Sequence, residues 1–231
     1  MLPVRDRMPT RRTPFVVYLL ILANVLAYVG LDARFVYQLG LVPARFVAHP
    51  EAQIATVFTS MFLHDPQSYL HLGGNMLFLW IFGDNVEDAL GSLRFLAFYL
   101  LAGVAAAMAQ ILVDPGSLVP MIGASGAISG VLAAYGSLYP RAPITVVNPV
   151  PLLWLFWGLF FDLPAWFVIL EYFVANLLNA VFSVGHGSSG VAFFAHLGGF
   201  VAGLFLVRLF MIGREAGRPA RWDRFLPDRE R

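Results

Sequence analysis

Cysteine and lysine are both absent from this chain of 231 residues. Without cysteine, the protein has no disulfide framework, no thiol nucleophile and no thiolate metal site. Charged residues are also scarce, at 13% of the chain, whereas 59% of the residues are apolar and 15% are aromatic. This composition excludes an ordinary soluble domain and predicts a polytopic membrane protein of one domain.

The patterns of several functional classes are missing as well. No His-Glu-x-x-His stretch is present, so the usual helix of a zinc metalloprotease is excluded. Paired aspartates inside apolar runs, which an aspartyl intramembrane protease needs, are also missing. We find no internal repeat, whereas transporters usually show internal symmetry or broken helices in corresponding halves. We expect a protein that works without metal or cofactor.

All basic residues are arginines, and most of them lie in two clusters. The first is Arg5, Arg7, Arg11 and Arg12, and the second is Arg208, Arg214, Arg218, Arg221, Arg224, Arg229 and Arg231. By the positive-inside tendency both tails are cytoplasmic, so the number of membrane crossings is even. Nucleic acid or lipid headgroups are alternative partners, but short arginine-rich tails beside membrane spans are more often topology signals. We therefore expect no nucleic-acid partner.

Six apolar runs are the predicted transmembrane helices of an all-α membrane protein. They are Phe15–Gly30, Leu70–Asp88, Leu93–Leu112, Gly123–Tyr139, Pro164–Val184 and Val191–Ile212. A signal peptide is an alternative for the first run, but further spans follow and no small-x-small cleavage site ends it. The stretch Ile144–Phe161 is apolar too, but Asn148, Pro149 and Pro151 interrupt it, and we expect an interfacial or partly inserted segment. A seventh span there would place the two arginine-rich tails on opposite sides.

The expected organisation has three parts. Residues 1–14 form a cytoplasmic N-terminal tail, residues 15–212 form a six-helix domain, and residues 213–231 form a cytoplasmic C-terminal tail. Within the domain, the long connection Leu31–Tyr69 is expected to be ordered and partly embedded in the membrane. The segment Gly185–Gly190 is expected to be a small flexible loop.

Polar groups occur near the same end of three predicted spans. His71 and Asn75, four residues apart, share one face of the second span. Ser125 opens the fourth span, and His196 lies near the start of the sixth. Because these three spans all run from outside to inside, the four side chains can share one depth. Such groups inside a bilayer are costly and usually indicate function.

A hydroxyl and an imidazole are the minimum that acyl transfer requires, because the ring removes the hydroxyl proton and later returns it to the leaving group. No acidic residue lies in the outer turns of these helices, so we expect a dyad of Ser125 and His196. The Ser125 backbone N–H, the Asn75 amide and the His71 ring are candidate donors to an oxyanion. The alternative to a catalytic role for the segment Met121–Val131 is that its glycine and serine residues only pack against neighbouring helices.

Two pairs of glycines support this geometry. Gly126 and Gly130 form a small-xxx-small face on the fourth span, and Gly199 and Gly203 form one on the sixth. Glycine at both faces lets two helix backbones approach closely. A short hydrogen bond between Ser125 and His196 requires such an approach.

Three motifs carry a family resemblance. In chain order they are His71-x-x-x-Asn75, Gly123-x-Ser125-Gly126 and Ala195-His196-x-x-Gly199-x-x-x-Gly203. Together they resemble the signature of the rhomboid family of intramembrane serine proteases. Further matches are Phe62-Leu63-His64, Phe82-Gly83, Val86-Glu87 and Gly91, and the resemblance extends from about Val17 to Phe210.

The resemblance implies a six-helix bundle with a water-accessible cavity open to the outer side. It implies Ser125 as nucleophile, His196 as general base, and His71 and Asn75 at an oxyanion hole. Substrates would be the transmembrane segments of single-pass membrane proteins, and the expected location is a bacterial inner membrane. In some bacterial members an aromatic residue one turn after the nucleophile packs on the base, whereas Ser129 stands there in this chain.

Several alternatives stay open. The main alternative to a protease is a non-catalytic rhomboid-like protein that binds transmembrane helices. Loss of Ser125 or His196 would indicate such a protein. Aromatic residues of the fifth span indicate either a lateral gate or a lipid-facing surface, and Glu171 in that span has no evident partner. The remaining histidines, His49, His64 and His186, lie in expected loops and are interpreted as structural or solvated. The oligomeric state is not predicted.

Overall fold

The computed structural model describes residues 1–148, 150, 154, 158–183 and 193–213. Its helices are α1 Phe15–Gly30, α2 Ala33–Leu39, α3 Pro43–Ala48, α4 Pro50–Thr59, the short 3-10 helix η1 Ser60–Phe62, α5 Tyr69–Leu90, α6 Ser92–Val113, α7 Ser125–Leu138, α9 Ala165–Ser183 and α10 Phe193–Phe210. Its strands are β1 Leu2–Asp6, β2 Pro143–Val147 and β3 Phe160–Pro164. The protein is therefore mostly helical.

Every predicted span contains an observed helix. The first helix begins and ends at the predicted residues, and the ends of α5, α6, α7 and α9 lie within two residues of the prediction. Helix α10 begins at Phe193, at the edge of the described part of the chain. The predicted loop Gly185–Gly190, His186 and residues 214–231 of the predicted C-terminal tail lie outside the described residues.

Three of the described helices are long and apolar enough to cross a membrane, namely α6, α9 and α10. Helices α1 and α7 are apolar but shorter. Helix α5 has sufficient length, but its last two turns carry Asp84, Glu87 and Asp88. These helices support a membrane protein, and the number of six crossings stays a prediction.

The expectation of an all-α fold was wrong in one respect, because a three-stranded antiparallel sheet is present in the order β1-β2-β3. Strand β1 comes from the predicted N-terminal tail, and β2 and β3 come from the region expected to be interfacial. The run Ile-Thr-Val-Val in β2 is β-branched and favours a strand. At five residues each, the strands give a weaker sequence signal than the long apolar helices.

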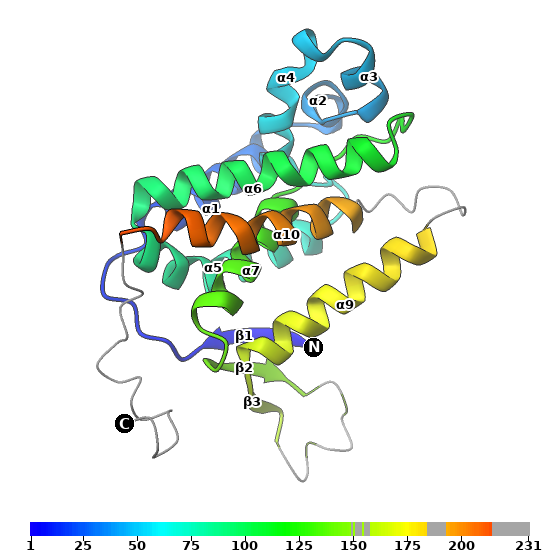
Figure 1. The fold of residues 1–231 in the computed structure, drawn as a ribbon. Coiled ribbons are helices and arrows are strands. Elements are labelled where there is room, and N and C mark those ends of the chain that lie inside the picture. Colours follow the sequence, from blue (N-terminus) through cyan, green and yellow to red (C-terminus); the bar gives the residue numbers. More distant parts are fainter. Residues whose placement is uncertain (149, 151–153, 155–157, 184–192, 214–231) are drawn as a thin grey trace.

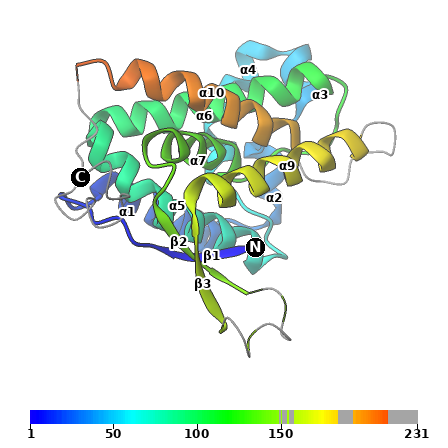
Figure 2. The same ribbon diagram turned by 60° about the horizontal axis from the view of Figure 1, so that its bottom comes forward.

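The sheet lies beside the start of α9 and the end of α7, and the helices α2 to α4 form a lobe on the far side of α6 (Figure 1; Figure 2). Asp6 of β1 accepts hydrogen bonds from the Asn85 amide of α5 at 2.9 Å and the Tyr135 hydroxyl of α7 at 2.8 Å. Burial, with the nearby Asp84 carboxylate, raises the pKa of Asp6 to about 7. The N-terminal strand thus joins the sheet to two helices of the bundle.

Glu171, which had no evident partner in the sequence, lies in α9 and pairs with the amino group of Met1. Arg7, just after β1, forms a second ion pair with Asp162 of β3 at 2.8 Å. The two pairs connect the N-terminal segment to the last strand and to the helix that follows it. Both involve partly exposed side chains, so each contributes little stability by itself.

Glu87 of α5 connects its own helix to the start of α1 and the start of α6. Its carboxylate accepts the backbone N–H groups of Val16 and Val17 at 3.0 and 2.8 Å, and the Ser92 hydroxyl at 2.6 Å. The first N–H groups of a helix have no intrahelical partner, so this contact caps α1 from α5. The side chain is buried, and these three hydrogen bonds satisfy its carboxylate oxygens.

Helices α7 and α10 cross in direct backbone contact. A Cβ atom added to Gly199 would lie 2.0 Å from the carbonyl oxygen of Gly126, and one added to Gly203 would lie 2.4 Å from that of Gly130. Backbone atoms cannot give way to a methyl group as the end of a side chain can. The predicted glycine contact between the fourth and sixth spans is therefore present.

We expect Gly203→Ala to lower the free energy of unfolding by about 1–3 kcal/mol, the usual cost of overpacking a tight contact. Thermal unfolding in detergent, followed by light scattering, measures the effect. Gly73→Ala in α5 is the matched control, because its added methyl group meets nothing within 4 Å. Equal melting temperatures for the two variants would contradict the close crossing.

Candidate active site

Ser125 is the first residue of α7, and the turn before it is shaped by glycine. Gly123 has a φ of +115°, a region that L side chains rarely adopt, and a Cβ there would lie 2.8 Å from Nε2 of His71. Its N–H donates to the carbonyl of Ser60 at 2.9 Å, which fixes the turn to η1. The turn that precedes Ser125 therefore lies against the His71 ring.

The four residues expected to form the site come together. Nε2 of His196 in α10 lies 2.7 Å from Oγ of Ser125, a normal hydrogen-bond distance. His71 and Asn75 of α5 line the same cavity as this pair. The glycine crossing of α7 and α10 brings the hydroxyl and the imidazole within reach.

The His71 ring has a defined tautomer. Its Nδ1 accepts the backbone N–H of Asp65 at 3.3 Å, so the proton is on Nε2, beside Gly123. The ring can therefore donate into the cavity from Nε2. This geometry supports the oxyanion donor expected from the sequence.

The Asn75 side chain is held from behind by a histidine. Its Nδ2 lies 2.9 Å from Nε2 of His64, and the amide donates because Nδ2 carries only protons. One N–H is used in this contact, and the second is left for the cavity. His64, interpreted from the sequence as structural or solvated, is buried at 3% exposure and positions the Asn75 amide.

His64 must be neutral to accept this hydrogen bond. Burial, with repulsion from the nearby His71 ring, lowers the pKa of His64 from 6.5 to about 4. The two rings meet edge to face with centroids 5.0 Å apart. The motif Phe62-Leu63-His64 signalled this residue in the sequence, but only its position in the fold shows what it contacts.

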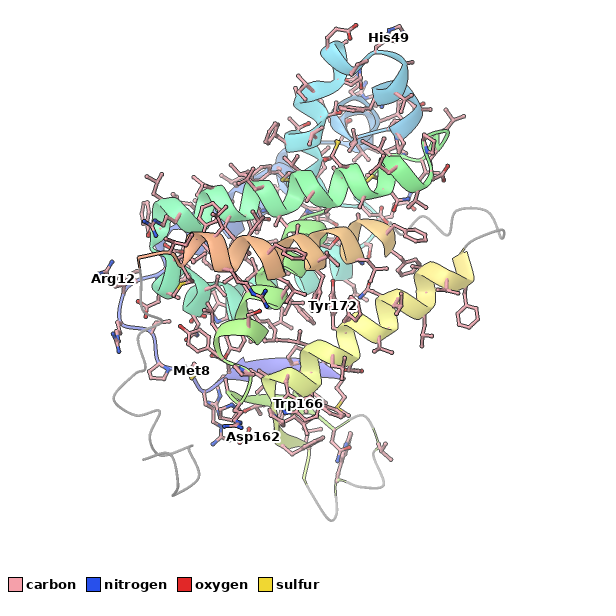
Figure 3. The ribbon with its side chains drawn as sticks, viewed as in Figure 1. Met8, Arg12, His49, Asp162, Trp166 and Tyr172 are labelled. Atoms are coloured by element: carbon pink, nitrogen blue, oxygen red, sulfur yellow. The ribbon has the colours of Figure 1, made fainter. Side chains whose placement is uncertain are left out.

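Two side chains of α9 that the sequence motifs did not indicate reach the site. Oδ1 of Asn176 lies 2.6 Å from Nδ1 of His196. The Tyr172 hydroxyl lies 2.7 Å from Oγ of Ser129, and its ring centroid is 6.4 Å from that of His196. Tyr172 is on the side of α9 that faces the other helices (Figure 3). Two aromatic rings thus lie near His196, that of Tyr172 from α9 and that of Phe193 from α10, whose centroid is also 6.4 Å from that of His196.

A cavity of about 690 Å³ opens over these residues. Its polar lining includes Asp65, His71, Asn75, Ser125 and His196. Apolar side chains of α5 and α7 complete the wall, together with the segment that precedes α7. Its volume is in the usual range for a binding site, and both members of the Ser125–His196 pair line it.

His49 does not contribute to the site. His49 is exposed in the lobe of α2 to α4, far from the cavity (Figure 3). Within the described ranges, no group of three His, Cys, Asp or Glu side chains is arranged to hold a metal ion.

Comparison with known proteins identifies similar chains. The family model of the Rhomboid domain matches residues 51–212. Rhomboid protein 1, mitochondrial, of Saccharomyces cerevisiae is 37% identical over 101 residues, covering 42% of this chain and 29% of that protein. The human presenilin-associated rhomboid-like protein, mitochondrial, is 29% identical over 171 residues, covering 70% of this chain and 40% of that protein. Rhomboid protease GluP of Bacillus subtilis is 47% identical over 64 residues, covering 28% of this chain and 12% of that protein.

These matches span less than half the length of each relative. Two of the three relatives are named as mitochondrial, so they do not support the narrower prediction of a bacterial inner membrane. What stands is a membrane location, which the apolar helices indicate.

The lowered pKa of His64 predicts how the stability of the fold depends on pH. Its folded-state pKa of about 4 lies below the unfolded value of 6.5, so the unfolded chain binds the proton first as pH falls. The contribution of His64 is complete above pH 6.5 and is lost progressively as pH falls toward about 4. Melting temperatures measured across this range should fall more steeply for the parent than for His64→Gln. The exposed His49→Gln should follow the parent, and identical slopes for parent and His64→Gln would refute the assignment.

Proposed function

The chain belongs to the rhomboid family, and from this premise we propose that it is an intramembrane serine endopeptidase. It cleaves the transmembrane segments of single-pass membrane proteins, with Ser125 as nucleophile and His196 as general base. The observation that carries the proposal is the 2.7 Å contact between Oγ of Ser125 and Nε2 of His196 in a cavity with polar walls. This contact is the first requirement for activation of a serine hydroxyl.

In acylation, Oγ of Ser125 attacks the carbonyl carbon of the scissile peptide while its proton passes to Nε2 of His196. The tetrahedral intermediate then collapses, the C–N bond breaks, and the imidazolium returns the proton to the departing amine. Water attacks the acyl-enzyme ester in the second half, again losing a proton to His196. The second tetrahedral intermediate collapses, the bond between the carbonyl carbon and Oγ breaks, and the imidazolium returns the proton to Oγ, which releases the carboxyl product and restores the hydroxyl of Ser125.

The negative charge on the intermediate needs hydrogen-bond donors placed in advance. The Ser125 backbone N–H, the His71 Nε2–H and the free N–H of Asn75 are the candidates. Donors fixed before the reaction stabilise this charge without reorganisation, which is why such groups contribute strongly. The contacts of His71 with Asp65 and of Asn75 with His64 provide this fixing.

Hydrolysis at this depth imposes two further conditions. Water must reach the acyl-enzyme where lipid supplies none, and the polar cavity provides a place for it. The substrate must also leave its helical form near the scissile bond, because an intact helix keeps its carbonyls in internal hydrogen bonds. Substrates with helix-destabilising residues near the cleaved bond are therefore favoured.

The dyad is tested by reconstitution of the purified protein in liposomes with a generic single-span substrate. Ser125→Ala and His196→Ala should abolish product, whereas His49→Ala, on the distant lobe, should cleave like the parent. A fluorophosphonate probe should label the parent on Ser125 and fail to label Ser125→Ala. Equal product from the parent and the two dyad variants would remove the proposed mechanism. Helix binding without cleavage or labelling would instead identify a non-catalytic rhomboid-like protein.

The oxyanion donors are tested by kinetics. His71→Ala should lower kcat about 10²- to 10³-fold with a small change in KM, because the lost donor acts mainly on the developing charge. Asn75→Ala should act in the same direction. Initial rates over a range of substrate concentrations separate the two constants. A change confined to KM would mean that these side chains bind the substrate and do not stabilise the intermediate.

A further inference from the structure

We propose that Asn176 is a positioning residue, which holds His196 in the tautomer and orientation that accept the Ser125 proton. The expected dyad thus has a third, uncharged member on α9. This inference rests on the proposed function of the same site and adds a residue to it. Asn176 is buried at 9% exposure, and none of the three sequence motifs contains it.

The orientation of the Asn176 amide follows from its own helix. Its Nδ2 donates to the backbone carbonyl of Tyr172, one turn earlier, at 2.8 Å. The remaining atom, Oδ1, therefore faces Nδ1 of His196 at 2.6 Å. With the amide turned over, Oδ1 would face the Tyr172 carbonyl, and two acceptors would meet without a proton between them.

The amide orientation decides which ring nitrogen carries the proton. An amide oxygen only accepts, so Nδ1 of His196 must be the N–H donor to Asn176. In the neutral ring, Nε2 is then an unprotonated acceptor, and it faces the Ser125 hydroxyl at 2.7 Å. A general base needs this arrangement, since a ring protonated on Nε2 cannot remove the hydroxyl proton.

A second contact from α9 fixes the same part of the site. Oγ of Ser129 donates to the backbone carbonyl of Ser125 at 2.8 Å, so its one proton is used. The Tyr172 hydroxyl must therefore donate to Ser129, at 2.7 Å. The same tyrosine orients Asn176 through its carbonyl, so one turn of α9 holds the base and contacts the helix of the nucleophile.

An amide suits this position better than a carboxylate for an electrostatic reason. A buried carboxylate is costly unless it is paired, whereas a neutral oxygen selects the tautomer without that cost. The titratable groups around the His196 ring are His71 and Asp65, which line the same cavity, and Tyr172 of α9. Among the described residues at the cavity, Asp65 is the one carboxylate.

The first test compares two asparagines of one helix. Asn176→Leu replaces the amide by a group of similar volume without an acceptor, and Asn179→Leu makes the same change at an exposed position of α9. Loss of the partner that orients a metal-ligating histidine typically costs about 10- to 100-fold, and we use the same range for the amide that orients His196. We expect such a loss in kcat for Asn176→Leu, with KM changed less than twofold and a slower fluorophosphonate reaction at Ser125. Asn179→Leu should match the parent, and a kcat within twofold of the parent for Asn176→Leu would overturn the proposal.

The second test separates positioning from packing. Asn176→Asp keeps an oxygen against Nδ1 and adds a charge that favours the imidazolium, so the acidic limb of its pH–rate profile should move to higher pH. At a pH above that limb it should recover most of the activity that Asn176→Leu loses. A superimposable pH profile, or no recovery, would contradict the contact.

A third measurement does not depend on cleavage. Nitrogen NMR of the protein labelled with ¹⁵N-histidine, with the His196 signal identified by its loss in His196→Ala, should show the proton on Nδ1 in the parent. It should show a mixture of tautomers in Asn176→Leu. The same spectrum in both would overturn the positioning role. If the parent is inactive but the tautomer of His196 still changes between the parent and Asn176→Leu as expected, only the protease function is rejected.

Discussion

The contact between the backbones of α7 and α10 is the constraint on which the site depends. A methyl group on Gly199 or Gly203 of α10 would collide with the backbone of α7 at Gly126 or Gly130, so there is no room for one between the two helices. A nucleophile and a base carried by different helices meet within hydrogen-bond distance only when the helix axes are this close. The backbone contact is therefore a precondition for the chemistry, and it explains why a glycine of the helix contact lies within three residues of each functional side chain, Gly126 after Ser125 and Gly199 after His196.

The other end of the bundle is held by polar groups, where apolar packing alone does not fix the position of one helix relative to another. Glu87 caps α1 and accepts the Ser92 hydroxyl, while Asp6 joins β1 to Asn85 and Tyr135. These hydrogen bonds are directional and set the rotation and height of α5 and α7. The site residues of α5 and α7 gain their alignment partly from contacts that lie two or more turns away.

Much of the fold can be derived from the sequence, and so can four residues of the site, His71, Asn75, Ser125 and His196. Long apolar runs show where the helices are, and the expected even number of crossings predicts that His71, Ser125 and His196 lie near one another. Strands of five residues carry no comparable signal, because their pairing depends on partners far along the chain, as between Leu2 and Val147. Asn176 is not indicated by the sequence, because a neutral amide in an apolar helix does not stand out as an acidic third member would. Its position seven residues before the end of α9 matches the depth of the other groups.

Helix α9 has one exposed apolar side and one side that packs against the site. Trp166, Leu170 and Phe182 are exposed on the outer side, which favours the lipid-facing interpretation for part of its aromatic surface. Tyr172 and Asn176 face inward, and Phe173 packs on Phe200 of α10. Since the acceptor for Nδ1 of His196 belongs to α9, a displacement of this helix away from α10 breaks that hydrogen bond. The glycine crossing of α7 and α10 does not involve α9 and survives such a displacement, so the nucleophile and the base would stay close while the tautomer of the base is released.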